Sequence, residues 1–366
     1  MSQSTPSTTS RPSSRRVVFM DDNGRIWTEE APLPPLGFGE LLIEVRASLV
    51  SPGTELGGVK GRRARRKENP GKRAFGYSNA GVLAAKGEGC DQFEIGDRLA
   101  GMGGGYALHA THANIPQNLC AKMLDSVSYE EGAACHLAAT ALHAVQRGRI
   151  GIAENVAVAG LGMVGQLVCQ TARIAGAHVL GLDVNALRLE TALRAGADRV
   201  ENAAEMNVDA AREEFTNGYG FDCGVIAFGG DATGAFRQLR SLLKISPDGH
   251  KMGRIVIVGG ASIQHGFAAG AGNIDVVSAA RTGPGYHDEA YERGAHYPPV
   301  FVPRPTQRNL ETVLRFMAEG RLDVKTLITD MVPIDRAAEA CEKLIQTPDQ
   351  ALGVVFTMNG YEAGSD

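Results

Sequence analysis

The chain has 366 residues, of which 43% are hydrophobic and 6% aromatic, and its formal net charge is −4. This length exceeds what one compact core usually needs, so we expect two domains. The mildly acidic balance is unlike that of a dedicated nucleic-acid binder, and no apolar run reaches the roughly 18 residues that a membrane span requires. We therefore expect neither nucleic acid nor membrane among the partners.

The first 16 residues are rich in Ser, Thr and Pro, contain no acidic residue and lack the apolar core of a secretion signal. This composition predicts a short disordered tail, with an organelle-targeting segment as the alternative. The six cysteines form no closely spaced pair, and most lie in apolar stretches. We expect buried, reduced thiols and a cytoplasmic protein.

From residue 17 to about 120, short apolar runs alternate with turns rich in Gly and Pro, which is typical of an antiparallel β domain. We expect strands at 41–45, 81–84 and 97–100. An Ala-rich helical pattern follows at 128–146.

From residue 154 the pattern changes to an alternation of strands and helices. Apolar runs of four between amphipathic helices predict an α/β fold with a doubly wound parallel sheet. The expected strands lie at 156–159, 179–182, 225–228, 255–258 and 275–277, and the helices between them at 164–175, 185–195 and 232–243. More helix is expected within 305–350, and a closing strand at 353–356.

A glycine turn follows the first of these strands and reads Gly160-Leu161-Gly162-Met163-Val164-Gly165. Gly160 permits the tight turn, Gly162 lets the backbone approach a pyrophosphate, and Gly165 lets the helix pack close to the strand. The helix start, with Met163 and Val164, offers free N–H groups and a positive dipole end to phosphates. This context predicts a dinucleotide site, and the alternative is a turn without a ligand.

Asp183 ends the strand after the glycine turn. Its carboxylate would accept hydrogen bonds from both hydroxyls of the adenosine ribose and would repel a 2′-phosphate, so NAD is favoured over NADP. Arg188 lies close in the sequence and could help to hold a phosphate, which weakens the discrimination.

Further motifs resemble the medium-chain dehydrogenase/reductase superfamily. They are residues 76–82 (GYSNAGV), 96–99 (GDRL), 327–329 and 337–340. The resemblance covers nearly all of the chain after residue 17. It implies a GroES-like antiparallel β catalytic domain (17–150 and 300–366), a Rossmann dinucleotide-binding domain (151–299), and a homodimer or homotetramer.

Within that superfamily the segments 51–55 (SPGTE), 76–78 and 283–286 (GPGY) resemble a zinc-independent branch associated with polyol, sugar or cyclitol ketones and bacteriochlorophyllide-type alcohols. The positions that bind catalytic zinc in other members here carry Pro52, Tyr77 with Ser78, and His136. Proline has no donor atom, and Tyr and Ser are poor zinc ligands, so we expect no metal.

Carbonyl reduction without zinc needs another group to stabilise and protonate the alkoxide. The resemblance places three candidates at the reacting carbon. Tyr77 could donate to the oxyanion, His136 could titrate near neutral pH and shuttle the proton, and Thr54 matches a relay hydroxyl. The alternatives are a half-buried strand residue, a helix residue bonded to a backbone carbonyl, and a turn cap.

Two further stretches are candidates for substrate recognition. Tyr286 and His287 lie in a polar loop that resembles a substrate-pocket loop of this branch, although a surface turn is the alternative. The run from Lys60 to Arg73 contains eight basic residues and could attract an anionic substrate, with a solvated loop as the alternative. We interpret His109 as structural.

Together these features predict an NAD(H)-dependent, zinc-independent oxidoreductase that interconverts a secondary alcohol and a ketone. Its expected partner is a small molecule, either polyhydroxylated (sugar- or cyclitol-like) or anionic. The alternatives are a metal-free reductase of enone C=C bonds and a cofactor-binding protein without turnover.

Overall fold

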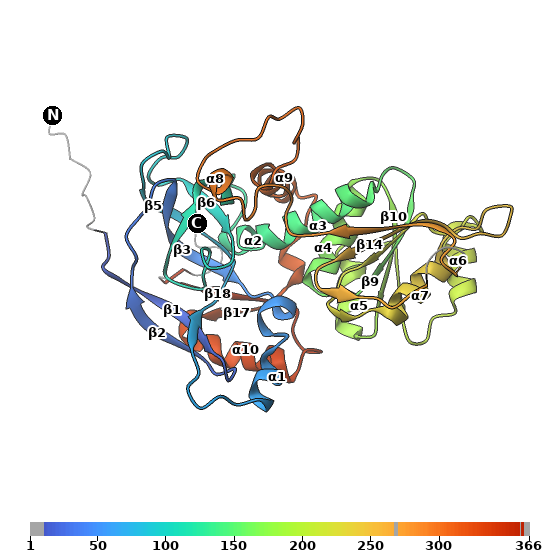
Figure 1. Cartoon of the computed structure of the whole chain (residues 1–366), viewed down its shortest axis with the longest axis horizontal. Helices are drawn as coiled ribbons and strands as arrows, with labels where there is room; N and C mark the ends of the chain where they lie inside the picture. Colours follow the sequence, from blue (N-terminus) through green and yellow to red (C-terminus); the bar gives the residue numbers. More distant parts are fainter. Residues whose placement is uncertain (1–10, 267–269, 359, 362–366) are drawn as a thin grey trace.

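The structure, a computed structural model, describes residues 11–266, 270–358 and 360–361. It has two lobes, one built from both ends of the described chain and the other from its middle (Figure 1). The strand β1 begins at Ser14, so the expectation of a tail through residue 16 is wrong for its last three residues. The backbone of this strand pairs with β2, which orders it. Residues 1–10 of the expected tail lie outside the described residues.

The first lobe contains a seven-stranded sheet in which β3 is central. One edge of β3 pairs with β5, and the other is shared between β7 and β18. All pairs are antiparallel except β17 with β18, and β17 lies where the sequence indicated only helix. The bounds are β3 (Glu40–Leu49), β5 (Ser78–Lys86), β6 (Arg98–Met102), β7 (His112–Pro116), β8 (Cys120–Lys122), β17 (Ile328–Pro333) and β18 (Gly353–Thr357). A second sheet joins β1 (Ser14–Asp21), β2 (Ile26–Pro32) and β4 (Lys72–Ala74).

The second lobe is a six-stranded parallel sheet with the order β11-β10-β9-β12-β14-β16. This is the strand order of a doubly wound dinucleotide-binding fold. Its strands are β9 (Asn155–Ala159), β10 (His178–Asp183), β11 (Arg199–Asn202), β12 (Cys223–Ile226), β14 (Met252–Val258) and β16 (Asn273–Ala279). Its helices are α4 (Met163–Ile174), α5 (Ala186–Arg194), α6 (Val208–Thr216) and α7 (Thr233–Leu242). The short β11 and the helix α6 were not predicted.

Both faces of this sheet are buried, which explains the continuous apolar runs. Val156 and Val158 of β9 belong to one core, which extends into the other lobe. Ala157 and Ala159 point the other way, into a second core with Phe236 of α7. The six cysteines are all buried and free, as expected. In the described part of the chain, no helix is long and apolar enough to cross a membrane.

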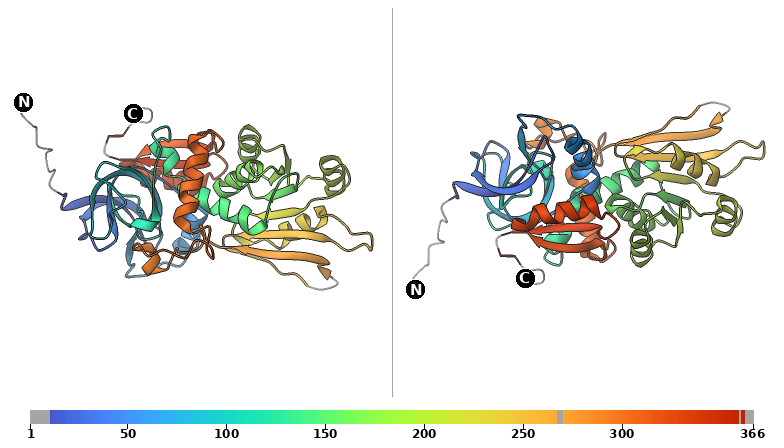
Figure 2. Two further views of the ribbon diagram at one scale, coloured as in Figure 1. Left: turned by 90° about the horizontal axis from the view of Figure 1, so that it is seen from above. Right: turned by 90° about the horizontal axis from the view of Figure 1, so that it is seen from below.

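The helix α3 (Cys135–Gly148) lies between the lobes and packs against strands of both large sheets (Figures 1 and 2). The helix expected over residues 128–146 is in fact two helices, α2 (Tyr129–Gly132) and α3. A capping box formed by Ser128 and Glu131 starts α2. The start of α3 carries His136 to the junction of the lobes.

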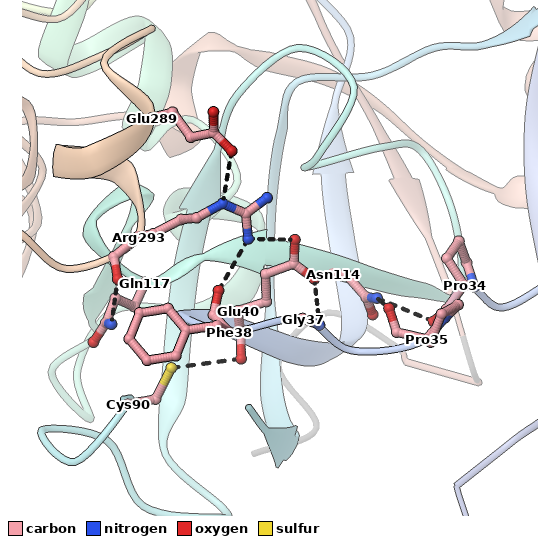
Figure 3. Close-up of polar contacts among 10 residues, drawn as sticks. All are labelled: Pro34, Pro35, Gly37, Phe38, Glu40, Cys90, Asn114, Gln117, Glu289 and Arg293. Carbon is pink, nitrogen blue, oxygen red and sulfur yellow. Dashed lines mark hydrogen bonds and ion pairs between the residues drawn. The ribbon is translucent and has the colours of Figure 1, made fainter. Parts of the chain in front are cut away.

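A second connection is the bridging segment, residues 281–305, which includes α8 (Glu289–Glu292) and leads to α9 (Thr306–Ala318). It leaves the edge of the parallel sheet and lies on the first lobe. Arg293 pairs with Glu40 at 3.1 Å and donates to the carbonyl of Phe38, and Gln117 donates to the carbonyl of Arg293 (Figure 3). These contacts fix the bridging segment, which starts at the second lobe, to the surface of the first lobe. The last helix, α10 (Ala337–Gln346), packs on β2.

Candidate active site

The glycine turn joins β9 to α4 at the carboxyl edge of the parallel sheet. Gly160 has a φ of +90°, and a Cβ there would lie 2.8 Å from the ring of Phe228. A Cβ at Gly165 would overlap the carbonyl oxygen of Gly160. Gly162, the N-cap of α4, is different because a Cβ there would meet nothing within 4 Å. The turn therefore needs two glycines for its own packing and has a third that leaves open space above the helix start.

That open space is suited to a pyrophosphate. The first N–H groups of α4, at Met163 and Val164, have no acceptor within the helix. They lie at the positive end of a twelve-residue helix. A side chain at Gly162 would fill the space that a phosphate needs. The residues present therefore fit a dinucleotide.

Asp183 ends β10 beside the glycine turn and is 8% exposed. One carboxylate oxygen accepts from the N–H of Leu161 at 2.7 Å, and the other accepts from those of Val184 and Asn185. The guanidinium of Arg188 lies 3.6 Å from the carboxylate. The backbone holds the acidic group at the turn, where the adenosine ribose of a dinucleotide would lie.

The positions that match zinc ligands do not form a metal site. Pro52 begins the single turn η1 (Pro52–Leu56) and offers no donor. The hydroxyl of Ser78 is buried and donates to the carbonyl of Ala133 at 2.6 Å. Nδ1 of His136 is 2.9 Å from the carbonyl oxygen of Tyr77, so only its Nε2 remains as a nitrogen donor. Among the described residues no group of three His, Cys, Asp or Glu side chains could hold a metal ion.

The three predicted catalytic residues lie together at the junction of the lobes. The rings of Tyr77 and His136 meet edge to face with centroids 4.5 Å apart. Burial raises the pKa of Tyr77, and the neighbouring side chains of Ser51 and Thr54 oppose that shift. Thr54 is exposed, so this group of hydroxyls connects a half-buried phenol to solvent.

The electrostatics of the site favour neutral groups. Burial raises the pKa of Tyr77 well above its usual range, and the charge of Glu55 adds to this shift. Burial lowers the pKa of His136 to about 4. The expectation that His136 titrates near neutral pH is therefore wrong, because its surroundings disfavour the charged form. At neutral pH both side chains are uncharged hydrogen-bonding groups.

The site also contains a buried pair that the sequence did not indicate. Glu55, with 5% of its side chain exposed, accepts from the N–H of Ser51 at 2.7 Å. Its other oxygen lies 3.1 Å from Nε2 of His109, whose Nδ1 lies 2.9 Å from the hydroxyl of Ser48. Glu55 follows Thr54 directly, which is the one available signal. Nothing in the spacing places His109, more than fifty residues away, beside it.

Of the two predicted substrate residues, Tyr286 lies closer to the site. Its ring centroid is 5.9 Å from that of His136, and its hydroxyl accepts from the N–H of Gly104 at 2.7 Å. His287 is exposed and stacks on Tyr286 with centroids 3.9 Å apart. Arg281 and His287 both have positive φ, at 63° and 73°. The backbone of this loop is therefore strained at Arg281 and His287. Between these two residues, the ring of Tyr286 meets that of His136 edge to face.

The basic run from Lys60 to Arg73 is partly paired with acidic side chains. Arg63 binds Glu342 through two nitrogens, and Lys67 pairs with Asp22. Lys72 also pairs with an acid, Glu29. The run contains α1 (Val59–Ala64), which directly follows η1. Three of its eight basic side chains are therefore paired with acidic side chains on the lobe surface.

A hollow of about 620 Å³ lies elsewhere, between the bridging segment and the first lobe. Its lining includes Phe38, Gln117 and Arg293, but none of the predicted site residues. The polar groups of Gln117 and Arg293 bind neighbouring protein atoms. We assign it no role in catalysis.

Comparisons with known proteins agree with the fold. Residues 163–283 match the family of zinc-binding dehydrogenases. The chain is 25% identical over 377 residues to sorbitol dehydrogenase of Bacillus subtilis (strain 168), covering 95% of this chain and 98% of the relative. It is 28% identical over 261 residues to L-threonine 3-dehydrogenase of Pectobacterium atrosepticum, covering 64% and 70%. Its fold is similar to that of alcohol dehydrogenase TADH from Thermus sp. ATN1, with a TM-score of 0.75, 22% identity and coverage of 94% and 100%.

A doubly wound domain with an intact glycine turn, joined to an antiparallel β lobe, defines the class of two-domain dehydrogenases. The chain belongs to the medium-chain dehydrogenase/reductase superfamily.

Proposed function

We propose that this chain is an NAD(H)-dependent oxidoreductase that interconverts a secondary alcohol and a ketone without zinc. The observation that carries the proposal is the position of the Tyr77–His136 pair at the start of α3, the helix that packs both on α4, which follows the glycine turn, and on strands of the first lobe. The relatives support an enzyme of the alcohol dehydrogenase type, since they are named sorbitol dehydrogenase, L-threonine 3-dehydrogenase and probable D-xylulose reductase A.

A nicotinamide cofactor fits this site, and we propose NAD over NADP. Two structural relatives have titles that report bound NADP and NADH respectively, so both forms occur on this fold. In this chain the buried Asp183 places a carboxylate at the ribose position. It would repel a 2′-phosphate, and the nearby Arg188 is already within 3.6 Å of that carboxylate. We therefore expect the negative charge of Asp183 to have a larger effect on cofactor preference than the positive charge of Arg188.

The bound nicotinamide ring supplies or accepts the hydride. Tyr77, which keeps its proton across the neutral range, donates a hydrogen bond to the substrate oxygen and stabilises the charge that develops there. In reduction, Tyr77 gives its proton to the alkoxide and takes another from the hydroxyl of Thr54, which is exposed and receives one from solvent in turn. In oxidation the same three transfers run in reverse. His136, which is neutral near pH 7, packs against the ring of Tyr77 and does not act as an acid.

We propose a polyhydroxylated substrate, of the sugar or cyclitol kind. The side chains at the mouth of the site, Thr54, Tyr286 and His287, offer hydroxyl and imidazole groups suited to substrate hydroxyls. Sorbitol dehydrogenase and probable D-xylulose reductase A among the relatives support this class. The partly neutralised basic run supports an anionic substrate less well.

The proposal is tested by calorimetric binding of NAD⁺ and NADP⁺, followed by assays of sorbitol, xylitol and myo-inositol with absorbance at 340 nm. We expect tighter binding of NAD⁺ and turnover of at least one polyol by protein dialysed against a chelator and shown by elemental analysis to lack zinc. A clear preference for NADP⁺, or activity that appears only when zinc is restored, contradicts the proposal. Conversion of an enone to a saturated ketone would instead support a C=C reductase.

A further inference from the structure

His109 is a buried histidine that the proposed mechanism does not use. It is inaccessible to solvent, and its ring is flanked edge to face by Phe75 at 5.2 Å and Phe356 at 5.0 Å. Its backbone is held on both sides, by bonds to Phe75 and Val18. With Nδ1 2.9 Å from the hydroxyl of Ser48, Nε2 on the other side of the ring lies 3.1 Å from a carboxylate oxygen of Glu55 as a close ionic contact, without the alignment of a hydrogen bond.

Glu55 connects this fixed ring to the turn at the site. Its N–H donates to the carbonyl of Ser51 at 2.9 Å, and its side chain accepts from the N–H of Ser51. The turn between these residues contains Thr54, and the side chains of Ser51 and Thr54 lie close enough to the phenol of Tyr77 to lower its pKa against the larger effect of burial. The opposite side of the turn is open, because a Cβ at Gly53 would meet nothing within 4 Å. Glu55 therefore anchors the turn from its buried side.

We propose that Glu55 and His109 are positioning residues, which hold the Ser51–Thr54 turn so that its hydroxyls orient the phenol of Tyr77. The effect of this pair on the reaction rate rests on the proposed function, whereas its effect on the orientation of Tyr77 does not. We assign the pair no contact with the substrate. It acts through the turn, in the way that partners behind a catalytic group fix its orientation and so set the rate.

The direct test is the NMR signal of the phenolic carbon of Tyr77, which reports the hydrogen bonding of its hydroxyl. The full-length protein is labelled with ¹³Cζ-tyrosine, and the Tyr77 resonance is identified by its loss in Tyr77→Phe. We expect Glu55→Gln and His109→Leu to shift this resonance. We expect His109→Gln, whose amide nitrogen can replace Nε2, to restore part of the original position. Glu131→Gln is the matched control, since Glu131 is a buried acid that caps α2.

The proposal is overturned if folded Glu55→Gln and His109→Gln both leave the Tyr77 resonance in place, or if Glu131→Gln shifts it equally. The two Gln variants keep side-chain volume and polar atoms, so they answer the question even where His109→Leu fails to fold. In polyol oxidation with NAD⁺, we expect Glu55→Gln to lower kcat in the native chain but not further in Tyr77→Phe. Absence of polyol turnover would count against the proposed function, whereas the NMR shifts would still test the positioning role of the pair independently.

Discussion

Nδ1 of His136 lies 2.9 Å from the carbonyl oxygen of Tyr77, and the two rings meet with centroids 4.5 Å apart. One ring nitrogen of this histidine thus contacts the backbone of Tyr77. Its bond requires a proton on Nδ1, which leaves Nε2 unprotonated in the neutral ring. The contact supports Tyr77 from one side while the turn around Ser51 holds it from the other.

Replacing Tyr77 by phenylalanine removes the proposed donor to the substrate oxygen. We expect kcat for polyol oxidation to fall by about 10²-fold or more, while the Kd for NAD⁺ is unchanged. Tyr219→Phe is the control, because Tyr219 is 80% exposed. An unchanged kcat in Tyr77→Phe, measured by steady-state kinetics, would remove this residue from the mechanism.

The lowered pKa of His136 makes folding stability depend on pH. The unfolded histidine binds a proton below about pH 6.5, whereas the folded one does so only near pH 4. Between these values the unfolded state holds more protons, so the free energy of unfolding falls on acidification, by about 3 kcal/mol for this residue. The contribution is complete above pH 6.5 and is lost as the pH approaches 4.

Urea unfolding of the native chain and His136→Gln at pH 7 and pH 4.5 measures this effect. We expect the native chain to lose more stability than the variant over that interval. His250→Asn, a change at an exposed histidine, should keep the native pH dependence. Equal losses in the native chain and His136→Gln would show that His136 is not the group responsible.

Alanine substitutions at Gly162 and Gly165 should have different effects, the first on cofactor binding and the second on the stability of the protein. Gly162→Ala adds a Cβ to open space, so we expect an unchanged Tm and a Kd for NAD⁺ raised by at least about tenfold, or about 1.4 kcal/mol. Gly165→Ala overlaps the carbonyl of Gly160, so the protein itself should be destabilised. Thermal unfolding and calorimetry of both variants check this. Undiminished NAD⁺ binding by Gly162→Ala would place the cofactor elsewhere.

Neutralising Asp183 should weaken the choice between cofactors. Asp183→Asn keeps an acceptor for the backbone N–H groups but removes the charge that would repel a 2′-phosphate and frees Arg188. We expect the ratio of the Kd values for NADP⁺ and NAD⁺ to fall by about tenfold. Asp198→Asn is a suitable control, because Asp198 accepts from the N–H of Val179 near the start of β10, away from Asp183 at its end, and pairs with Arg173. A ratio that does not move would show that Asp183 does not select the cofactor.

The sequence alone determined the superfamily, the doubly wound sheet and the residues of the dinucleotide turn. These features are local: Gly160 and Gly165 are required by backbone conformation and close packing within one strand–turn–helix unit, and Asp183 ends the adjacent strand. Only the tertiary structure decided the other half of the site. It brought His109 to Glu55 and Tyr286 to His136 from distant parts of the chain. It also set the charge of His136, because burial, which depends on the packing of both lobes, lowers the pKa that an isolated histidine would have.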